Sequence, residues 1–290
     1  MKKKVWPIIL AVILVIGATI AAFVIRNNRN KAEAYQKAVQ MTQTGNTTDA
    51  YRLFRELGSY QDAERRLSEL LVADALLPYR VAEKEDIVSF GHFEQDNDPS
   101  NGLEPIQWIV LDKMDGQLLL LSASCLKGMA YNTASFTPVT WETSSLRAWL
   151  NGDFLSSAFT EEEKALIPTV LNENPDHSIV ETPGGRDTRD QVFVLCERDT
   201  VIYLSSPADR EAIGKAPATE YAKANGLQTD EEGNASWWLR SPGMYEYIAQ
   251  FVDQNGEPYT NGASTDIDYL CGVRPVLWLN TNPSSEGGQI

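Results

Sequence analysis

Cysteine and histidine are scarce in this chain, which has three cysteines and two histidines among its 290 residues. None of them falls in a CxxC motif, an HExxH motif or another paired Cys and His spacing. Structural zinc sites and disulfide frameworks require such spacings. The sequence therefore predicts no metal site, no cofactor and no disulfide framework.

Basic residues are scarce beyond residue 31. The chain has 25 basic and 40 acidic residues, for a formal net charge of -15. Six basic residues and no acidic residue lie in residues 1–31, so the remainder carries a net charge of -21. Because phosphate binding needs a basic face, this balance excludes nucleic acid as the main partner.

Catalytic motifs are missing as well, since the chain has no GxSxG motif and no glycine-rich phosphate loop. His177 stands in a polar stretch, residues 172–190, that is rich in turn-forming residues. These residues do not assemble into a nucleophile with its base. We therefore expect a binding protein rather than an enzyme.

One long apolar run lies near the amino terminus. Residues 5–25 carry no charge, and their number is about the ~20 residues that a helix needs to cross a ~30 Å hydrocarbon layer. We predict a single transmembrane helix that acts as a signal anchor, with residues 1–29 forming a cytoplasmic tip and the anchor. The carboxyl-terminal domain would lie outside the cell membrane, although the flanking positive charges nearly balance. Cleavage of a signal peptide after Ala21 is the alternative.

Helical periodicity follows, and the apolar positions of residues 30–77 predict three amphipathic helices. Gly45 separates the first helix from the second, and Gly58 ends the second. Residues 50–63 resemble tetratricopeptide repeats over at most one and a half repeats, whereas a solenoid needs about three. We therefore predict a helical tetratricopeptide-like spacer over residues 30–80, with a peptide-binding groove as the alternative.

Alternation with a period of two begins near residue 86 and predicts a mixed, mostly antiparallel α+β domain over residues 85–280, followed by a flexible tail, residues 281–290. Asn151 and Gly152 are expected to end a helix over residues 144–150. Thr160 and Glu163 form a capping box that opens another helix, and a third is expected over residues 218–224. The expected strands are residues 87–93, 105–112, 117–122, 192–195, 236–241, 247–253 and 272–279.

Several phrases of the second domain occur together in one order: residues 104–112 (EPIQWIVLD), 146–151 (LRAWLN), 237–243 (WWLRSPG) and 273–279 (VRPVLWL). With them, the chain resembles an uncharacterised domain family of Gram-positive bacterial proteins, often found behind a membrane anchor. More distantly, residues 237–240, 247–259 and 272–274 resemble the end of the C-type-lectin-like and formylglycine-generating fold. That resemblance implies a compact mixed domain with its ligand site in irregular loops. It does not carry the oxidase activity over, because that activity uses a nearby pair of cysteines.

Two adjacent tryptophans mark the candidate ligand site. Successive side chains of a strand point to opposite faces, so Trp237 or Trp238 fills the core while the other faces a loop or solvent. An exposed tryptophan beside an arginine can stack on a sugar or an aromatic ligand. The predicted ligand-binding residues are Trp238, Arg240, Tyr245 and Tyr247. The alternative is that both indoles are buried and that Arg240 pairs with a buried carboxylate.

The acidic loop 96–102 places oxygen ligands at alternate positions, as calcium loops do. Pro99 and Gln107 break the calcium-loop pattern, so we interpret the segment as a hairpin turn. Arg147 and Arg274 lie among apolar residues and are expected to form structural ion pairs. The available carboxylates are Glu142, Asp153 and Asp266.

The leading hypothesis is a membrane-anchored, extracytoplasmic binding protein that does no chemistry. Its α+β domain would bind a glycan of the host or the cell envelope, another envelope component, or a protein. One alternative is an enzyme acting on envelope polymers, with Glu142 and Asp266 as acid and base. Another makes residues 30–77 the functional part, which recruits a partner while the carboxyl-terminal domain is a cap.

Overall fold

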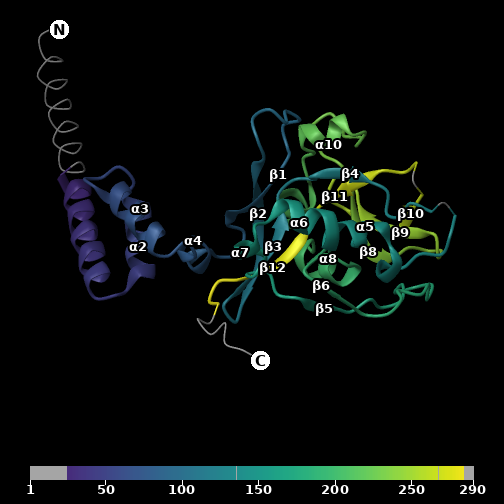
Figure 1. Ribbon diagram of the computed structural model, residues 1–290, viewed down its shortest axis with the longest axis horizontal. Coiled ribbons are helices and arrows are strands. Elements are labelled where there is room, and N and C mark those ends of the chain that lie inside the picture. The colour runs from purple at the N-terminus through teal and green to yellow at the C-terminus, as the bar shows by residue number, and fades with distance from the viewer. Residues whose placement is uncertain (1–24, 135, 267, 284–290) are drawn as a thin grey trace, which may run out of the picture. The chain divides into compact units, whose positions relative to one another are not determined.

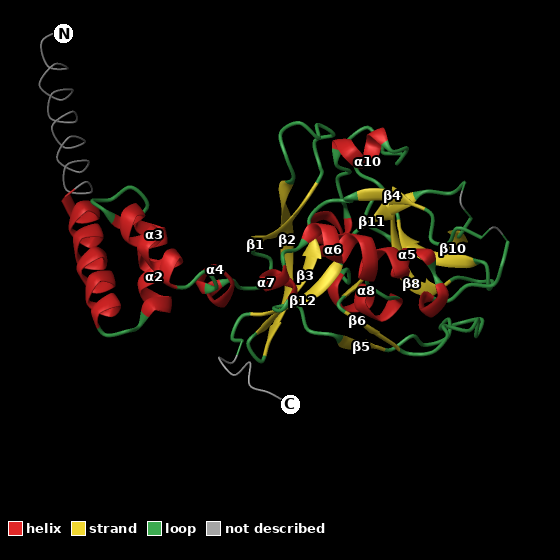
Figure 2. Cartoon of the chain, in the orientation of Figure 1, coloured by secondary structure: helices red, strands yellow, loops and turns green. Residues whose placement is uncertain are grey.

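The computed structural model describes residues 25–134, 136–266 and 268–283, and the chain divides into two compact units between Val81 and Ala82 (Figure 1). In its described residues, unit 1, up to Val81, is helical, whereas unit 2, from Ala82 onward, combines strands with short helices (Figure 2).

Unit 1 contains helix 25–43, α2 (Thr47–Leu57), α3 (Ala63–Ala73) and the short helix α4 (Leu77–Val81). Gly58 caps α2, and its backbone N–H donates to carbonyl oxygens of the last turn, as the sequence predicts. Tyr35 joins the helices, because its ring contacts Phe54 edge to face at 6.0 Å and its hydroxyl donates to Asp62. The three predicted amphipathic helices therefore share one core, and α4 is an addition.

The predicted transmembrane helix and signal anchor are wrong for the fold that the structure describes. Within residues 25–134, 136–266 and 268–283, no helix is long and apolar enough to cross a membrane. The described residues 25–43 are helical and carry Arg26, Arg29, Lys31 and Glu33, whose charges oppose burial in hydrocarbon. The rest of the apolar run lies outside the described residues.

The first sheet of unit 2 is antiparallel, with strand order β1-β2-β3-β12-β7. Its strands are β1 (Ile87–Phe93), β2 (Glu104–Met114), β3 (Gln117–Ser122), β12 (Val276–Asn280) and β7 (Val192–Phe193). The predicted strands 87–93, 105–112 and 117–122 are confirmed. Thr281, expected in a flexible tail, is buried and donates to the carbonyl oxygen of Gly116 at 2.8 Å.

The second sheet is mixed, with strand order β10-β9-β8-β11-β4, and its one parallel pair joins β8 to β11. Its strands are β10 (Pro258–Ser264), β9 (Ile248–Val252), β8 (Trp237–Pro242), β11 (Cys271–Val273) and β4 (Lys127–Met129). A separate pair joins β5 (Val170–Asn172) to β6 (Thr188–Asp190). The single strand predicted over residues 272–279 is in fact two strands, one in each sheet, so the segment through Pro275 links the sheets.

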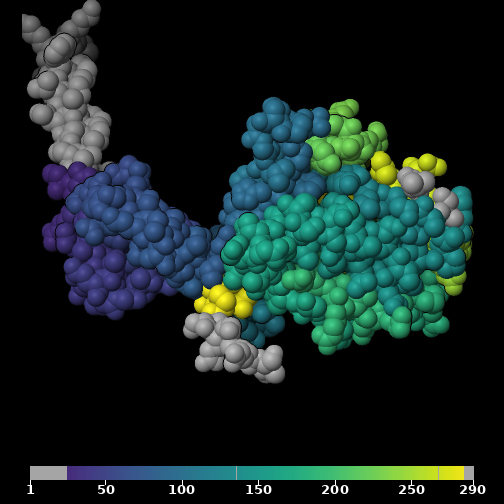
Figure 3. All heavy atoms as spheres, in the orientation of Figure 1, coloured from purple at the N-terminus to yellow at the C-terminus, as the bar shows by residue number. Residues whose placement is uncertain are grey.

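The helices of unit 2 are short and gather mostly in the middle of its sequence, and Figure 3 shows this part of the chain, coloured teal to green, on one face. They are η1 (Trp141–Thr143), α5 (Ser145–Trp149), η2 (Leu150–Phe154), α6 (Leu155–Ala158), α7 (Glu161–Lys164), α8 (Glu197–Tyr203), α9 (Pro207–Asp209), η3 (Arg210–Gly214) and α10 (Glu220–Ala224). The capping box of Thr160 and Glu163 is confirmed at α7.

The helix predicted to end at Asn151 instead continues through η2 into α6. Asn151 does not cap it. Its side-chain amide donates to the carbonyl oxygens of Arg147 and Val192, and its side-chain oxygen accepts from the backbone N–H groups of Gln191 and Val192. Asn151 therefore fastens the helix to β7, which is a tertiary role that a turn signal in the sequence does not reveal.

Candidate functional site

The turn between β8 and β9 positions the candidate site. Its backbone closes through hydrogen bonds from Gly243 N–H to the Ile248 carbonyl oxygen at 2.8 Å and from Ile248 N–H to the Tyr245 carbonyl oxygen at 3.0 Å. A Cβ atom at Gly243 would lie 2.5 Å from the Ile248 side chain and 2.8 Å from the Asn261 carbonyl oxygen, so the turn requires glycine there. Residues 244–247, which follow Gly243, are all exposed.

Tyr245 and Tyr247, which we call the tyrosine stack, project from this turn. Their ring planes are nearly parallel, at 8°, and their centroids lie 5.8 Å apart, within the range of offset-stacked aromatic pairs. The two residues are 55% and 39% exposed, so each has side-chain surface open to solvent. The tyrosine stack is therefore an ordered aromatic surface.

The backbone beneath the tyrosine stack is held from both sides. The N–H of Thr265 and its hydroxyl both donate to the Tyr247 carbonyl oxygen, at 3.2 and 3.0 Å, and Val139 N–H donates to the Glu246 carbonyl oxygen at 2.8 Å. These bonds fix the backbone from which the rings project, which lowers the backbone entropy lost on binding.

Phe136 is a third exposed aromatic residue in the loop that precedes Val139. It is 76% exposed and has a φ of +51°, a value that bulky side chains rarely adopt. The Asp266 carboxylate holds this conformation by accepting from the Phe136 N–H at 2.8 Å. Asp266 follows Thr265, so the same β10-to-β11 segment supports Phe136 and the tyrosine stack. The sequence contained no signal for this residue.

Trp238 does not belong to the exposed surface. It is fully buried, its indole N–H donates to the Met129 carbonyl oxygen at 2.8 Å, and Tyr131 and Tyr269 pack against its ring. Trp237 is buried as well and donates to the carbonyl oxygen of Gly214. Both faces of β8 are covered, so the structure has the alternative arrangement, in which both indoles are buried.

Arg240 also lies apart from the tyrosine stack. Its side chain is 8% exposed, and its guanidinium pairs with the Asp199 carboxylate at 3.0 Å. The structure therefore brings together Tyr245 and Tyr247 but not Trp238 or Arg240. Arg240 lines a different pocket.

The other two singled-out arginines have different partners from those expected. Arg147 pairs at 2.6 Å with Asp190, whose side chain is completely buried. Asp190 also accepts from Trp141, Asn172 and Thr188, which makes it the centre of a buried polar network that the sequence analysis missed.

Arg274 does not form the predicted ion pair with a carboxylate. It is fully buried, donates to the carbonyl oxygens of Ser122 and Ile213, and lies 5.0 Å from the centroid of the Trp237 ring. Burial lowers the pKa of this guanidinium to about 10, which leaves it charged at neutral pH. Carbonyl dipoles and an aromatic face here take the place of a carboxylate.

The two carboxylates considered as acid and base, Glu142 and Asp266, both accept hydrogen bonds from other residues. Glu142 accepts from exposed Arg186, and that guanidinium holds the pKa of Glu142 below its usual range, which disfavours a general acid. Asp266 accepts from the Phe136 backbone. Both carboxylates therefore have partners among the described residues.

The acidic loop is part of the connection between β1 and β2. One carboxylate oxygen from each of Glu94, Asp96 and Glu104 lies within 4.8 Å of the others. Glu104 accepts from two backbone N–H groups, and Asp96 accepts from the Asp98 N–H and the Asn101 amide. These bonds are what a hairpin turn requires, and we assign no metal.

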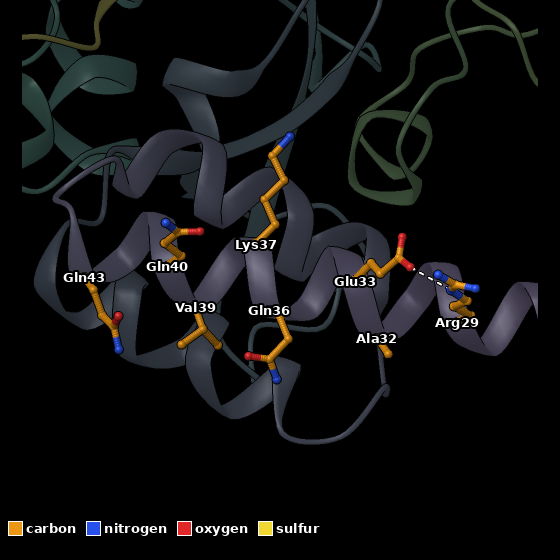
Figure 4. Close-up of a pocket in the computed structure, with 8 residues that line it drawn as sticks. All are labelled: Arg29, Ala32, Glu33, Gln36, Lys37, Val39, Gln40 and Gln43. Carbon is orange, nitrogen blue, oxygen red and sulfur yellow. Dashed lines mark hydrogen bonds and ion pairs between the residues drawn. The ribbon is translucent and has the colours of Figure 1, made fainter.

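Two further hollows are weaker candidates. One, of about 630 Å³, is lined by residues of helix 25–43 alone, and Figure 4 shows their side chains pointing in several directions. The other, of about 450 Å³, lies beside Tyr269 and Cys271. Burial raises the pKa of the Cys271 thiol, so this cysteine is not an activated nucleophile.

Comparisons with known proteins show to which family the chain belongs. Residues 115–281, more than half of the chain, match the model of a family described as a domain of unknown function, DUF6273. Neither the search of curated proteins nor the search of solved structures found a match. The expected membership of an uncharacterised domain family is thereby confirmed, and the chain belongs to the DUF6273 family of domains of unknown function.

Proposed function

We propose that unit 2 is a carbohydrate-binding domain and that the tyrosine stack is its contact surface for a sugar ring. The observation that carries this proposal is the nearly parallel, solvent-exposed pair of Tyr245 and Tyr247 on a turn whose backbone is fixed. Aromatic rings bind the C–H face of a pyranose, and a tyrosine hydroxyl can bond to the sugar hydroxyls at its edge.

The surface suits a sugar better than a purely apolar ligand. Each tyrosine combines an apolar ring with a polar tip, as a pyranose combines an apolar face with a rim of hydroxyls. Phe136 adds a nearby exposed ring without a hydroxyl. Because an open aromatic surface buries only part of a sugar, we expect weak, millimolar to micromolar binding that several contacts along a glycan would strengthen.

We also propose, as a separate point, that unit 2 resembles the C-type-lectin-like fold. The three segments that carry it lie in the second sheet and the turns that join its strands, and Gly272 of β11 is paired with Trp237 of β8. Sugar binding is proposed from the tyrosine stack alone and does not depend on this resemblance.

The test is a screen of the full chain on a glycan array that includes peptidoglycan fragments, followed by titration of each hit. We expect Tyr245→Ala and Tyr247→Ala each to weaken binding at least tenfold. Tyr259→Ala is the matched control, because Tyr259 is an exposed tyrosine of β10, 48% exposed, that packs against Phe251 instead of the stack.

Two results would refute the proposal. The first is the absence of any binding by a chain whose circular dichroism shows it to be folded. The second is a hit whose affinity falls as much in Tyr259→Ala as in the two stack variants. Tyr245→Phe and Tyr247→Phe separate the contribution of the rings to binding from that of the hydroxyls, since they keep the rings and remove only the hydroxyls.

A further inference from the structure

A pocket of about 280 Å³ lies on unit 2 between the end of β5, with the residues that follow it, and the start of α8. Asn172 and Glu173 line it from the first side, and Cys196, Arg198 and Asp199 line it from the second. Arg240, from β8, also lines it. The pocket therefore brings together charged groups from three segments that are separate in the sequence.

Arg240 has a donor without a partner. Its side chain is 8% exposed, and one terminal nitrogen, Nη1, donates to the Val194 carbonyl oxygen at 2.7 Å and to the Asp199 carboxylate at 3.0 Å. Its Nε is buried and has no hydrogen-bond partner among the described residues. Its Cζ atom lies 5.6 Å from the centroid of the Phe193 ring. A buried charged donor without a hydrogen-bond partner is costly, so the pocket contains a cation whose hydrogen-bonding capacity the described residues do not fill.

The second cation of the pocket, Arg198, is exposed and pairs with Glu173 at 2.9 Å. Both side chains of this pair are about two thirds exposed, so the pair joins the two sides of the pocket within reach of solvent. Exposed ion pairs contribute little to stability, and a ligand that offers each partner a substitute charge can separate them at small cost.

The charges of the lining select the class of ligand. Two guanidinium groups and two carboxylates give the pocket a formal charge of zero at neutral pH. Burial raises the pKa of the Cys196 thiol, which therefore adds no negative charge. An inorganic dianion would leave a net negative charge in this partly buried place, whereas a molecule that carries both a carboxylate and an ammonium group adds none.

We propose that this pocket binds a small zwitterion of the class of free α-amino acids. The ligand carboxylate accepts from the guanidinium groups of Arg198 and Arg240, both of which line the pocket, and its ammonium group donates to Glu173. The volume admits a small or medium amino acid. This inference rests on residues other than the tyrosine stack, so it stands or falls separately from sugar binding.

The test is isothermal titration calorimetry of the full chain with a panel of free L- and D-α-amino acids. The same amino acids as N-acetyl derivatives, as amides, and inorganic phosphate are the comparison probes. We expect at least one free amino acid to bind, and its N-acetyl and amide forms to bind at least tenfold more weakly, because each lacks one of the two charges.

Three variants locate the site. Arg240→Lys keeps the charge but lacks the Nε donor, and we expect at least a tenfold loss of affinity. If this variant does not fold, Arg198→Gln and Glu173→Gln, both at exposed positions, are each expected to weaken binding threefold or more. Arg186→Gln is the matched control, since Arg186 is an exposed arginine that pairs with Glu142 instead.

The proposal is overturned if no free amino acid binds to the folded chain. It is also overturned if phosphate or the N-acetyl and amide forms bind as tightly as the free amino acid. Binding that Arg198→Gln and Glu173→Gln leave unchanged would place the ligand elsewhere and would refute the assignment.

Discussion

The tyrosine stack and the Arg240 pocket are two candidate binding regions of unit 2 with opposite constructions. The stack presents exposed rings on a backbone whose carbonyl oxygens, those of Tyr245, Glu246 and Tyr247, all accept hydrogen bonds. The pocket presents a buried cation with one unpaired donor. The first region offers a surface, and the second offers an unmet hydrogen bond.

This difference predicts different consequences of mutation. A side chain that projects into solvent can be truncated without disturbing the core, so its role shows in binding alone. A side chain within a buried polar network supports stability as well, and its removal leaves other charges unpaired. Variants of both kinds of side chain test this contrast, and the one that empties a buried network should cost the most stability.

The largest effect is expected at Asp190, beside the pocket. Asp190→Ala removes the carboxylate that accepts from Arg147, Trp141, Asn172 and Thr188, so it leaves a partly buried cation and buried donors without their partner. We expect the free energy of unfolding of unit 2 to fall by about 3–5 kcal/mol. Urea denaturation measures this, with the exposed Asp153→Ala as the control, expected to change stability by less than about 0.5 kcal/mol. Equal losses in the two variants would contradict the network.

The second effect separates Trp238 from the tyrosine stack. Trp238→Phe removes the indole donor to Met129 and leaves a small void, so we expect a loss of about 1–3 kcal/mol in the free energy of unfolding. Because the ring is buried, the affinity for a sugar that binds the stack should change by less than about twofold. A large loss of sugar affinity in a folded variant would show that Trp238 contributes to the surface after all.

The third effect concerns the stack itself. Tyr245→Ala and Tyr247→Ala should each lower the free energy of unfolding by less than about 1 kcal/mol, because the ring removed is exposed and its loss costs mainly one aromatic pair. Thermal or urea denaturation checks this. A loss above about 3 kcal/mol would mean that the stack is part of the core instead of a surface.

The smallest effect is the pH dependence of amino-acid binding in the Arg240 pocket. Arginine stays protonated throughout the accessible range, and the raised pKa of Cys196 keeps that thiol neutral. The dissociation constant should therefore change by less than about twofold between pH 6 and pH 8. Weaker binding as the pH rises would indicate that a thiolate forms beside the ligand carboxylate, which would contradict the raised pKa.

The strands could be predicted from the sequence where hydrophobic alternation determines them, as at β1, β2 and β3. Short strands such as β5 and β6 could not, because three residues contain too little periodicity. The predicted end of a helix at Asn151 was wrong because its side chain bonds to Val192 of β7, which lies 41 residues further along the chain. Such tertiary hydrogen bonds override the local preference of an Asn-Gly pair for a turn.

The candidate site could be predicted only in part. The sequence indicated Tyr245 and Tyr247, but it joined them to Trp238 and Arg240 on the basis of proximity along the chain. Alternation along β8 places Trp237 and Trp238 on opposite faces of the strand. It does not reveal that both faces are covered by other parts of the domain. The unpaired Arg240 donor depends on groups from three segments, and so only the fold reveals it.

Contact between the tyrosine stack and the sugar can be tested directly by a carbon-13 NMR titration. The full chain is labelled on its tyrosine rings. The ring signals of Tyr245 and Tyr247 are assigned with their phenylalanine variants, and the saccharide that binds best on the array is added. We predict that these two signals shift together along one binding curve while that of buried Tyr131 does not. Shifts at Tyr259 in their place, or a saturated sugar that leaves both signals unmoved, would contradict the claim.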